Sequence, residues 1–472
     1  MRLKKAAAVF LCAASIIATM DCSVKASVND NSSELEQKLE EAYVYTLPLM
    51  LVDATAAKMT NTVEATSTQA PVNQLIHARG LANADSKNVV TPNVDTVYSQ
   101  VYLDLSEDAV ILEMPKTERF CMAEVLDAYT NCISLMDAAS FENSSEKFIF
   151  TGKSFDGEVP DGMTEIKCPT DLAWVIIRTL CSGDEDLENV YEIQSGMDTY
   201  TLSQYASGST EEKSEGTYDA KYDYIPVQYL MGLSMEDYFT KANQLMEENP
   251  PAEEDSALME TLKEINVGPG LTFDSTVFGD SSDSLWEKLV SGISAACTEK
   301  SAKFIVQNGV WNYFGEPIAE FGTEYDYRAL VALGGLGANP VSVAVYPKAT
   351  TDSEGGRLNG ANRYVLHFDK ENIPETLENG FWSVTLYNSS DNLLSDNELD
   401  RYCINDRSDI EYNEDGSFDI YIQNEKPTDD LIKNWLPAPT GDFHLYLRVY
   451  LPDEKIISNE WEMPSINILE EE

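Results

Sequence analysis

The first stretch of the sequence that could do chemistry is TPNVDTVY, residues 91–98. Asn93 and Asp95 are separated by one residue, so in a strand both side chains point to the same face of the sheet. An amide beside a carboxylate could orient the hydroxyl groups of a sugar or polyol, or bind a cation, and Tyr98 could join such a site. The alternative is an Asx-type turn that begins the strand, with Asn93 bonded to the local backbone.

The second stretch is DAYTN, residues 127–131, which follows the expected strand RFCMAEVL. Asp127 could act with Asp95 as general acid and base if the two carboxylates lie within about 10 Å and their environments separate their pKa values. This is the hypothesis of a hydrolase or lyase, in which Tyr129 and Asn131 help to bind the ligand. The alternative is a turn whose polar groups are satisfied locally, with Arg119 as the counter-charge.

The C-terminal third contributes further candidate binding residues, which are aromatic or basic: His367, Trp382, Arg401, Trp435 and Arg448. Tryptophan faces stack on sugar rings, so a glycan-binding groove is one interpretation of Trp382 and Trp435. The other interpretation is that strand alternation directs both rings into a hydrophobic core, where large aromatic residues dominate the packing.

Several common sites are absent from the sequence. The three histidines, His77, His367 and His444, show neither H-x-H nor H-E-x-x-H spacing, and a single histidine on a strand is usually a packed, hydrogen-bonded residue. No G-x-S-x-G motif, EF-hand loop or phosphate-binding loop occurs. We therefore assign no metal site from the sequence, and the cofactor stays unknown.

The charge of the chain restricts its partners. Its 472 residues include 81 acidic and 32 basic side chains, which gives a formal net charge of -49. A field of this sign repels nucleic acids and anionic membrane surfaces, so neither is an expected partner. The partners that we expect are a small molecule or glycan, or further copies of the chain in a homo-oligomer.

The elements that must position these residues are mostly strands. Apolar and polar residues alternate in short runs from residue 93 to 180 and again from 341 to 451, with turn residues between the runs. This spacing predicts antiparallel sandwiches rather than alternating βαβ units. The expected fold class is mainly β with helical insertions (α+β), built as two antiparallel, jelly-roll-like β-sandwich domains.

The expected domain order begins with a targeting segment. It is a signal peptide (1–26), a disordered leader (27–33), an N-terminal β-sandwich (34–183), a helical connector (184–324) and a C-terminal β-sandwich (325–468). Basic residues precede a short apolar run in the first segment, which is typical of export and too short for a bilayer span. The predicted location is extracellular or in the cell envelope or periplasm. A lipid anchor at Cys22 is the alternative, which Asp21 directly before it disfavours.

Six cysteines follow the signal segment: Cys121, Cys132, Cys168, Cys181, Cys297 and Cys403. An exported location permits disulfides, but the irregular spacing leaves their pairing open. Buried free thiols are equally consistent with the sequence.

Motifs at both ends of the chain resemble a known pair of domains. The N-terminal motifs are TPNVDTVY, LDLSEDAVILEMP and RFCMAEVLDAYTN, and the C-terminal ones are YDYRALVALGGLGANP, GGRLNGANRYVLHF, FWSVTLYN, RYCI, DGSFDIYI, NWLPAP and LRVYLP. They resemble domain of unknown function 1254 followed by domain of unknown function 1214, from about residue 37 to 468. The resemblance implies two jelly-roll-like sandwiches with helical insertions, often exported from bacteria, and no activity. The N-terminal third has fewer aromatic and basic residues than this resemblance implies.

Two functions from different classes remain open at this point. One is a binding or assembly protein that takes a small polar or glycan-like ligand or forms an oligomer. The other is the hydrolase or lyase that uses Asp95 and Asp127.

Overall fold

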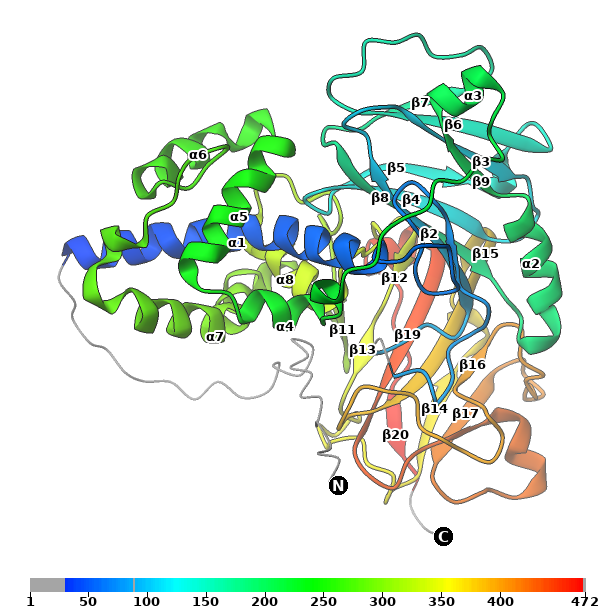
Figure 1. The fold of residues 1–472 in the computed structure, drawn as a ribbon. Helices are drawn as coiled ribbons and strands as arrows, with labels where there is room; N and C mark the ends of the chain where they lie inside the picture. The colour runs from blue at the N-terminus through cyan, green and yellow to red at the C-terminus, as the bar shows by residue number, and fades with distance from the viewer. Residues whose placement is uncertain (1–29, 88–89, 470–472) are drawn as a thin grey trace, which may run out of the picture.

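The computed structural model describes residues 30–87 and 90–469, which form two β-sandwiches and a helical unit beside them (Figure 1). The predicted signal peptide (1–26), with Cys22, and residues 27–29 of the predicted leader lie outside the described residues. Residues 30–33, which we expected in a disordered leader, instead form the first turn of helix α1 (Asp30–Met59).

The N-terminal sandwich consists of two sheets. The five-stranded sheet has the order β1 (Ile76–His77), β2 (Thr96–Asp104), β8 (Leu172–Leu180), β4 (Cys121–Asp127) and β5 (Cys132–Asp137). The four-stranded sheet has the order β7 (Thr164–Lys167), β6 (Ser145–Thr151), β3 (Val110–Pro115) and β9 (Asp198–Thr201). Alternate residues of the facing strands, such as Val101, Leu112 and Phe150, are buried in one core between the sheets. Helices α2 (Leu187–Ser195) and α3 (Leu202–Ser207) flank β9.

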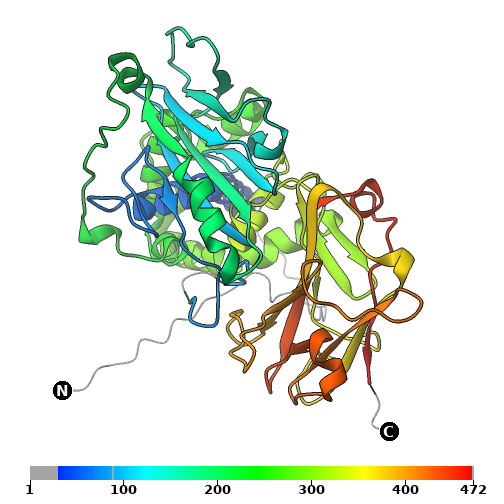
Figure 2. The ribbon, with the colours of Figure 1, turned by 90° about the vertical axis from the view of Figure 1, so that its right-hand side faces the viewer.

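The C-terminal sandwich also has two sheets. The larger one has the order β10 (Ile305–Asn308), β11 (Trp311–Phe314), β13 (Lys348–Ala349), β19 (Phe443–Pro452), β15 (Thr376–Asn388) and β16 (Cys403–Asn405), with β12 (Ala344–Val345) also paired to β19. The smaller one has the order β18 (Trp435–Pro437), β17 (Phe418–Gln423), β14 (Tyr364–Phe368) and β20 (Ile466–Ile468). The short helix α9 (Glu454–Ile457) follows β19. Figure 2 shows this half, coloured yellow to red, beside the N-terminal half.

The remaining helices form a unit with its own core. They are α1, α4 (Pro226–Met231), α5 (Met235–Glu248), α6 (Ser256–Leu262), α7 (Ser282–Lys300) and α8 (Tyr325–Gly335). Residues of these helices, such as Tyr43, Tyr238 and Trp286, bury one another in a single apolar cluster. Ser234 caps α5 by accepting a hydrogen bond from the Asp237 amide. Pro48 lies inside α1, which continues on both sides of it.

The prediction of a mainly β protein with sandwich-like sheets and helical insertions is confirmed. The helices, however, draw on more of the chain than the predicted connector. α1 and α8 lie outside residues 184–324 and pack in the helical core, whereas β9, β10 and β11 lie inside that range and pair with strands of the sandwiches.

Candidate functional site

Asp95 lies at the junction of the two sandwiches, just before β2. Its side chain is fully buried and accepts hydrogen bonds from Arg407 Nη2 at 2.6 Å and from Ser383 Oγ at 2.5 Å. Asn93 forms the Asx-type turn, because its Oδ1 accepts from the amides of Asp95 at 2.7 Å and Thr96 at 3.3 Å. Asp95 is therefore a structural ion-pair partner across the junction.

Asp127 is the last residue of β4, where the turn to β5 begins. Its carboxylate accepts hydrogen bonds from the amides of Tyr129 and Asn131, at 2.8 and 2.9 Å, and from Asn131 Nδ2 at 2.9 Å. Burial raises the pKa of Asp127, while these hydrogen bonds oppose the rise. Tyr129 is committed elsewhere, since its hydroxyl donates to the carbonyl of Asn249 at 2.8 Å. This arrangement is a turn whose polar groups are satisfied locally.

The two carboxylates do not meet, which corrects the acid–base hypothesis. Both β2 and β4 pair with β8, where Thr96 lies opposite Leu180 and Asp127 lies opposite Ala173. Seven residues of extended strand separate these positions, or about 23 Å. This exceeds the roughly 10 Å that a carboxylate pair tolerates. The structure therefore contradicts a hydrolase or lyase built on Asp95 and Asp127.

Arg119 is not the counter-charge of either carboxylate. It donates to Asp186 through Nη1 at 2.6 Å and Nη2 at 3.0 Å. Burial alone would raise the pKa of Asp186. The hydrogen bonds that it accepts from Arg119, Asn189 and the Ser182 amide lower this pKa to about 2. The pair ties the start of β4 to the segment that precedes α2.

The tryptophans proposed for glycan stacking lie in the protein interior. Trp382 stacks on Phe368 and Phe418, at centroid distances of 5.6 and 5.8 Å, between the sheets of the C-terminal sandwich. Trp435 is 2% exposed, and its Nε1 donates to the carbonyl of Gln423 at 2.9 Å. Their burial confirms the core interpretation and leaves neither ring face open to stack on a sugar.

Three further predicted residues have separate surroundings. Arg401 Nη1 donates to the carbonyls of Ile432 at 2.7 Å and Trp435 at 2.8 Å, which fixes the corner before β18. His367 is exposed on β14, and its hydrogen bond of 2.6 Å to Asp419 raises its pKa. Tyr98 lies under the guanidinium of Arg178 at 5.6 Å. The structure does not gather these residues into one site.

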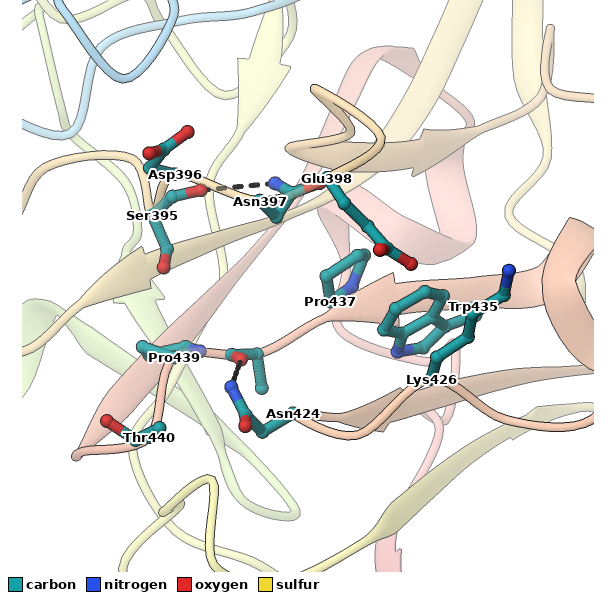
Figure 3. Close-up of a pocket in the computed structure, with 11 residues that line it drawn as sticks. Ser395, Asp396, Asn397, Glu398, Asn424, Lys426, Trp435, Pro437, Pro439 and Thr440 are labelled. Carbon is teal, nitrogen blue, oxygen red and sulfur yellow. Dashed lines mark hydrogen bonds between the residues drawn. The ribbon is translucent and has the colours of Figure 1, made fainter.

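A surface groove of about 480 Å³ lies beside Trp435 in the C-terminal sandwich (Figure 3). One wall is the loop 395–398, and the other comes from Asn424, Lys426 and the segment 437–440 that follows β18. Asn397 Nδ2 donates to the carbonyls of Ser395 and Arg401, at 3.1 and 2.9 Å, and thereby holds the first wall. Asn424 Nδ2 holds the second wall by donating to the carbonyl of Ala438 at 2.8 Å.

The groove presents polar groups that the protein does not use itself. Among the described residues, no hydrogen bond or ion pair engages the carboxylate of Glu398 or the ammonium of Lys426, although both line the groove. Figure 3 shows these two side chains extending over Trp435 and Pro437, with Thr440 at the far end. The groove therefore offers a negative group, a positive group, amides and a hydroxyl around an apolar floor.

A polar layer at the junction of the sandwiches was missed by the sequence reasoning. On β19, His444, Arg448 and Tyr450 are buried, whereas the apolar residues between them, such as Leu447, face the sandwich core. Arg448 Nη1 donates to Thr385 Oγ1 at 3.0 Å. The sequence HLYLRVY, residues 444–450, contained the signal for this layer. Its leucines and valine alternate with His, Tyr and Arg, and the structure buries both sets of side chains along most of β19.

Glu124 and Arg178 form a second buried pair at this junction. Arg178 Nη1 donates to Glu124 Oε2 at 2.7 Å and to Asn339 Oδ1 at 2.8 Å, and Nη2 donates to the carbonyl of Gly337 at 2.6 Å. Burial raises the pKa of Glu124 to about 7 against the opposing effect of Arg178. Burial by itself would lower the pKa of Arg178, but the Glu124 carboxylate and nearby tyrosines raise it, so the guanidinium stays charged.

The described part of the chain has no metal-binding cluster, membrane-spanning helix or disulfide. Within residues 30–87 and 90–469, no group of three or more His, Cys, Asp or Glu side chains could hold a metal ion. No helix in these ranges is long and apolar enough to cross a bilayer. The six cysteines of the described part are free thiols.

Two family models match the chain in the order that the motifs predict. Protein of unknown function (DUF1254) matches residues 72–201, and protein of unknown function (DUF1214) matches residues 343–454. The chain is a two-domain DUF1254–DUF1214 protein. The first model covers the N-terminal sandwich from β1 to β9, and the second covers most of the C-terminal sandwich. No functionally curated protein matches the chain.

Two solved structures are similar to the chain. The VPA0106 protein from Vibrio parahaemolyticus is 22% identical with a TM-score of 0.68, and the match covers 92% of this chain and 100% of that one. An uncharacterised protein from Burkholderia cenocepacia is 11% identical with a TM-score of 0.45, and the match covers 93% of this chain and 96% of that one. The first similarity shows that the DUF1254–DUF1214 protein has the fold of VPA0106, and it says nothing about a ligand.

Proposed function

We propose that the DUF1254–DUF1214 protein is an exported, non-catalytic binding protein that takes a small, hydroxyl-rich ligand such as a sugar in the groove beside Trp435. The observation that carries this proposal is the pair formed by Glu398 and Lys426. Both charged groups line the groove, and within the described residues neither has a protein partner. A group that gives no hydrogen bond to the protein is available to a ligand.

The size and lining of the groove support a ligand of the size of a small sugar. Its volume of about 480 Å³ is within the roughly 300–1,000 Å³ of small-molecule sites. Asn424 Oδ1 and Thr440 Oγ1 add neutral acceptors and donors to the charged pair, which suits a ring of hydroxyl groups. The rings of Pro437 and Pro439 supply an apolar surface for the carbon side of such a molecule. Trp435 serves as the floor and not as a stacking platform, because its ring is buried.

Isothermal titration calorimetry with a panel of monosaccharides, disaccharides and polyols tests the proposal. We expect one member to bind saturably and to raise the melting temperature, as any ligand of the folded state does. Glu398→Gln and Lys426→Met should each weaken that binding about tenfold or more, since each removes a charge-assisted hydrogen bond.

The control variant for these titrations is Glu371→Gln, which changes a carboxylate in a separate hollow of about 260 Å³ near α9. It removes one acidic charge without touching the groove, so it should leave the affinity unchanged. Equal affinities in all three variants, or no binding by any member of the panel, would refute the proposed function.

Homo-oligomerisation stays a prediction. The exposed large apolar side chains, among them Tyr218, Leu377 and Tyr412, are far apart in the sequence and belong to different segments. Light scattering at two protein concentrations measures the mass of the particle directly.

A further inference from the structure

The outer face of β19 gathers a dense set of buried polar side chains. His444, Tyr446, Arg448 and Tyr450 occupy alternate positions, so all four point away from the core of the C-terminal sandwich. His444 is 1% exposed and Arg448 is 5% exposed, while Tyr446 is partly open to solvent. Burying a polar group costs free energy of folding unless the group forms a hydrogen bond, so the partners of these side chains decide whether this face is stable.

Arg448 is a buried cation that the protein satisfies with neutral acceptors. It donates to Thr385 Oγ1 at 3.0 Å, to Tyr387 Oη at 2.8 Å and to the carbonyl of Thr91 at 3.3 Å. Among the described residues, no carboxylate lies within ion-pair distance of its guanidinium. Asp95, which acts on Arg448 electrostatically, is already paired with Arg407.

Lys348 adds a second buried positive charge to this face. It lies on β13 opposite Tyr446 of β19, is 7% exposed, and its ammonium lies 5.7 Å from the centre of the Tyr446 ring. The guanidinium of Arg448 lies 5.3 Å from the same ring. Two positive charges therefore flank one tyrosine in a protein whose formal net charge is -49.

His444 completes the cluster with an unused nitrogen. Its ring stacks on Tyr387 at 5.6 Å and lies edge-on to Tyr446 at 5.8 Å, so it shares both tyrosines with Arg448. Nδ1 lies 3.2 Å from Ser389 Oγ, but Nε2 is buried without a hydrogen-bond partner among the described residues. Burial and the charges of Lys348 and Arg448 lower the pKa of His444 to about 3, so the ring is neutral.

We propose that this cluster is a binding site for a small oxyanion, a phosphate or a carboxylate group, held by Arg448, Lys348 and His444. With the Ser389 hydroxyl donating to Nδ1, the neutral ring carries its proton on Nε2 and donates it to the anion. The anion brings a negative charge to a face that holds two buried cations. The hydroxyl of Tyr387 lies within the same cluster, where it donates to the carbonyl of Pro92 and accepts from Arg448.

Histidine NMR tests this site in the intact protein, because the chain has only three histidines. Spectra of ¹⁵N-histidine-labelled protein are recorded at pH 7 with increasing inorganic phosphate, and separately with acetate, at constant ionic strength set by sodium chloride. We expect the His444 ring resonances to shift saturably with at least one of the two probes, while His77 keeps its position. His444→Gln identifies the signal by its loss.

Lys348→Met supplies the second measurement. Removing that charge should weaken the apparent affinity for the anion at least tenfold, whereas Lys426→Met, which changes the separate groove, should not alter it. A response to phosphate alone assigns a phosphate site, and a response to acetate as well assigns a general oxyanion site. The proposal is overturned if the His444 signal stays fixed with both probes, or if it shifts equally in Lys348→Met. Neither result bears on the groove beside Trp435.

Discussion

The buried pair of Glu124 and Arg178 yields a prediction about stability and pH. Glu124 is fully buried on β4, where Oε2 accepts from Arg178 and Oε1 has no partner among the described residues. Burial raises its pKa from 4.5 to about 7. The substitution Glu124→Gln keeps the shape of the side chain and removes its titration, so it isolates the effect of this one proton.

The sign of the effect follows from proton linkage. The folded pKa is above the unfolded one, so between pH 4.5 and about 7 the folded protein holds a proton that the unfolded chain has lost. The stability that this proton contributes is complete below pH 4.5 and is lost as the pH rises through about 7. At about 1.4 kcal/mol per pH unit, the wild-type protein loses roughly 3 kcal/mol over this range.

The amide that replaces the Glu124 carboxyl in the variant cannot titrate, so the variant does not share this loss. We expect the unfolding free energy of Glu124→Gln, relative to wild type, to rise by roughly 3 kcal/mol between pH 4.5 and pH 8. Any constant cost of the amide cancels in this comparison. Urea titrations followed by tryptophan fluorescence measure the unfolding free energy of both proteins at each pH, with Trp174 on the adjacent strand β8 as a reporter.

The control for these titrations is Glu158→Gln, which removes a carboxylate from an exposed loop of the same sandwich. This variant shows how the unfolding free energy changes with pH when one exposed acidic charge is lost. A relative stability of Glu124→Gln that is flat with pH, or that falls between pH 4.5 and pH 8, would contradict the reasoning, because burial would then not control the titration of Glu124.

Four other expectations can be measured independently. Trp382→Ala should cost roughly 3–5 kcal/mol of unfolding free energy in urea, since it empties the centre of a core, and a loss below about 1 kcal/mol would contradict its placement. Asp95→Asn should cost about 3 kcal/mol by calorimetry, because it breaks a buried ion pair, and an unchanged melting temperature would argue against that pair. NMR titration should place the pKa of His367 above its ordinary value, and Asp419→Asn should lower it; an unchanged pKa in that variant rejects Asp419 as the cause. Terminal sequencing of exported protein should begin at Ser27, whereas intact retention of residue 1 speaks against the predicted signal peptide.

Period-two alternation predicted the sheets because it reports which face of a strand is buried. Trp382, Val384 and Leu386 alternate with small or polar residues on β15, and all three lie in the core of the C-terminal sandwich. The same rule failed on β19, where polar alternation marked a second buried face instead of a solvated one. A single strand cannot indicate what covers its outer side, and here the cover comes from residues about 350 positions away, such as Thr91.

The candidate carboxylates show why sheet order limits site prediction. Asp95 precedes β2 and Asp127 ends β4, and both strands run antiparallel to β8 between them. β2 and β4 are therefore parallel to each other, so the start of one and the end of the other lie at opposite ends of the sheet. The sequence contains both strands but not the position of β8. The Asx-type turn at Asn93 could be predicted from the sequence, because it depends only on neighbouring residues and not on the order of the strands.

The helical unit depended on long-range packing in the same way. The common core of α1, α5, α7 and α8 joins helices that are far apart in the sequence, from residue 30 at the start of α1 to residue 335 at the end of α8. Buried tyrosines of different helices, such as Tyr43 and Tyr238, meet there at a centroid distance of 4.9 Å. Assigning helices by their position in the chain therefore gave a connector, where the structure has a third packed unit.

Three buried arginines lie where these units meet, which gives the junctions a common chemistry. Arg178 joins the N-terminal sandwich to the carbonyl of Gly337, and Arg448 reaches Thr91. The guanidinium of Arg328 on α8 lies 5.4 Å from the ring centre of Tyr129, in the turn after β4 of the N-terminal sandwich. The acidic charge of the chain opposes close contact between the units. Buried cations that contact carbonyl groups and tyrosine rings offset this repulsion at the junctions, where water screens it least. A cation held by neutral partners keeps its charge and can still attract an anion. An oxyanion at Arg448 would therefore stabilise the contact between the sandwiches as well as occupy a site.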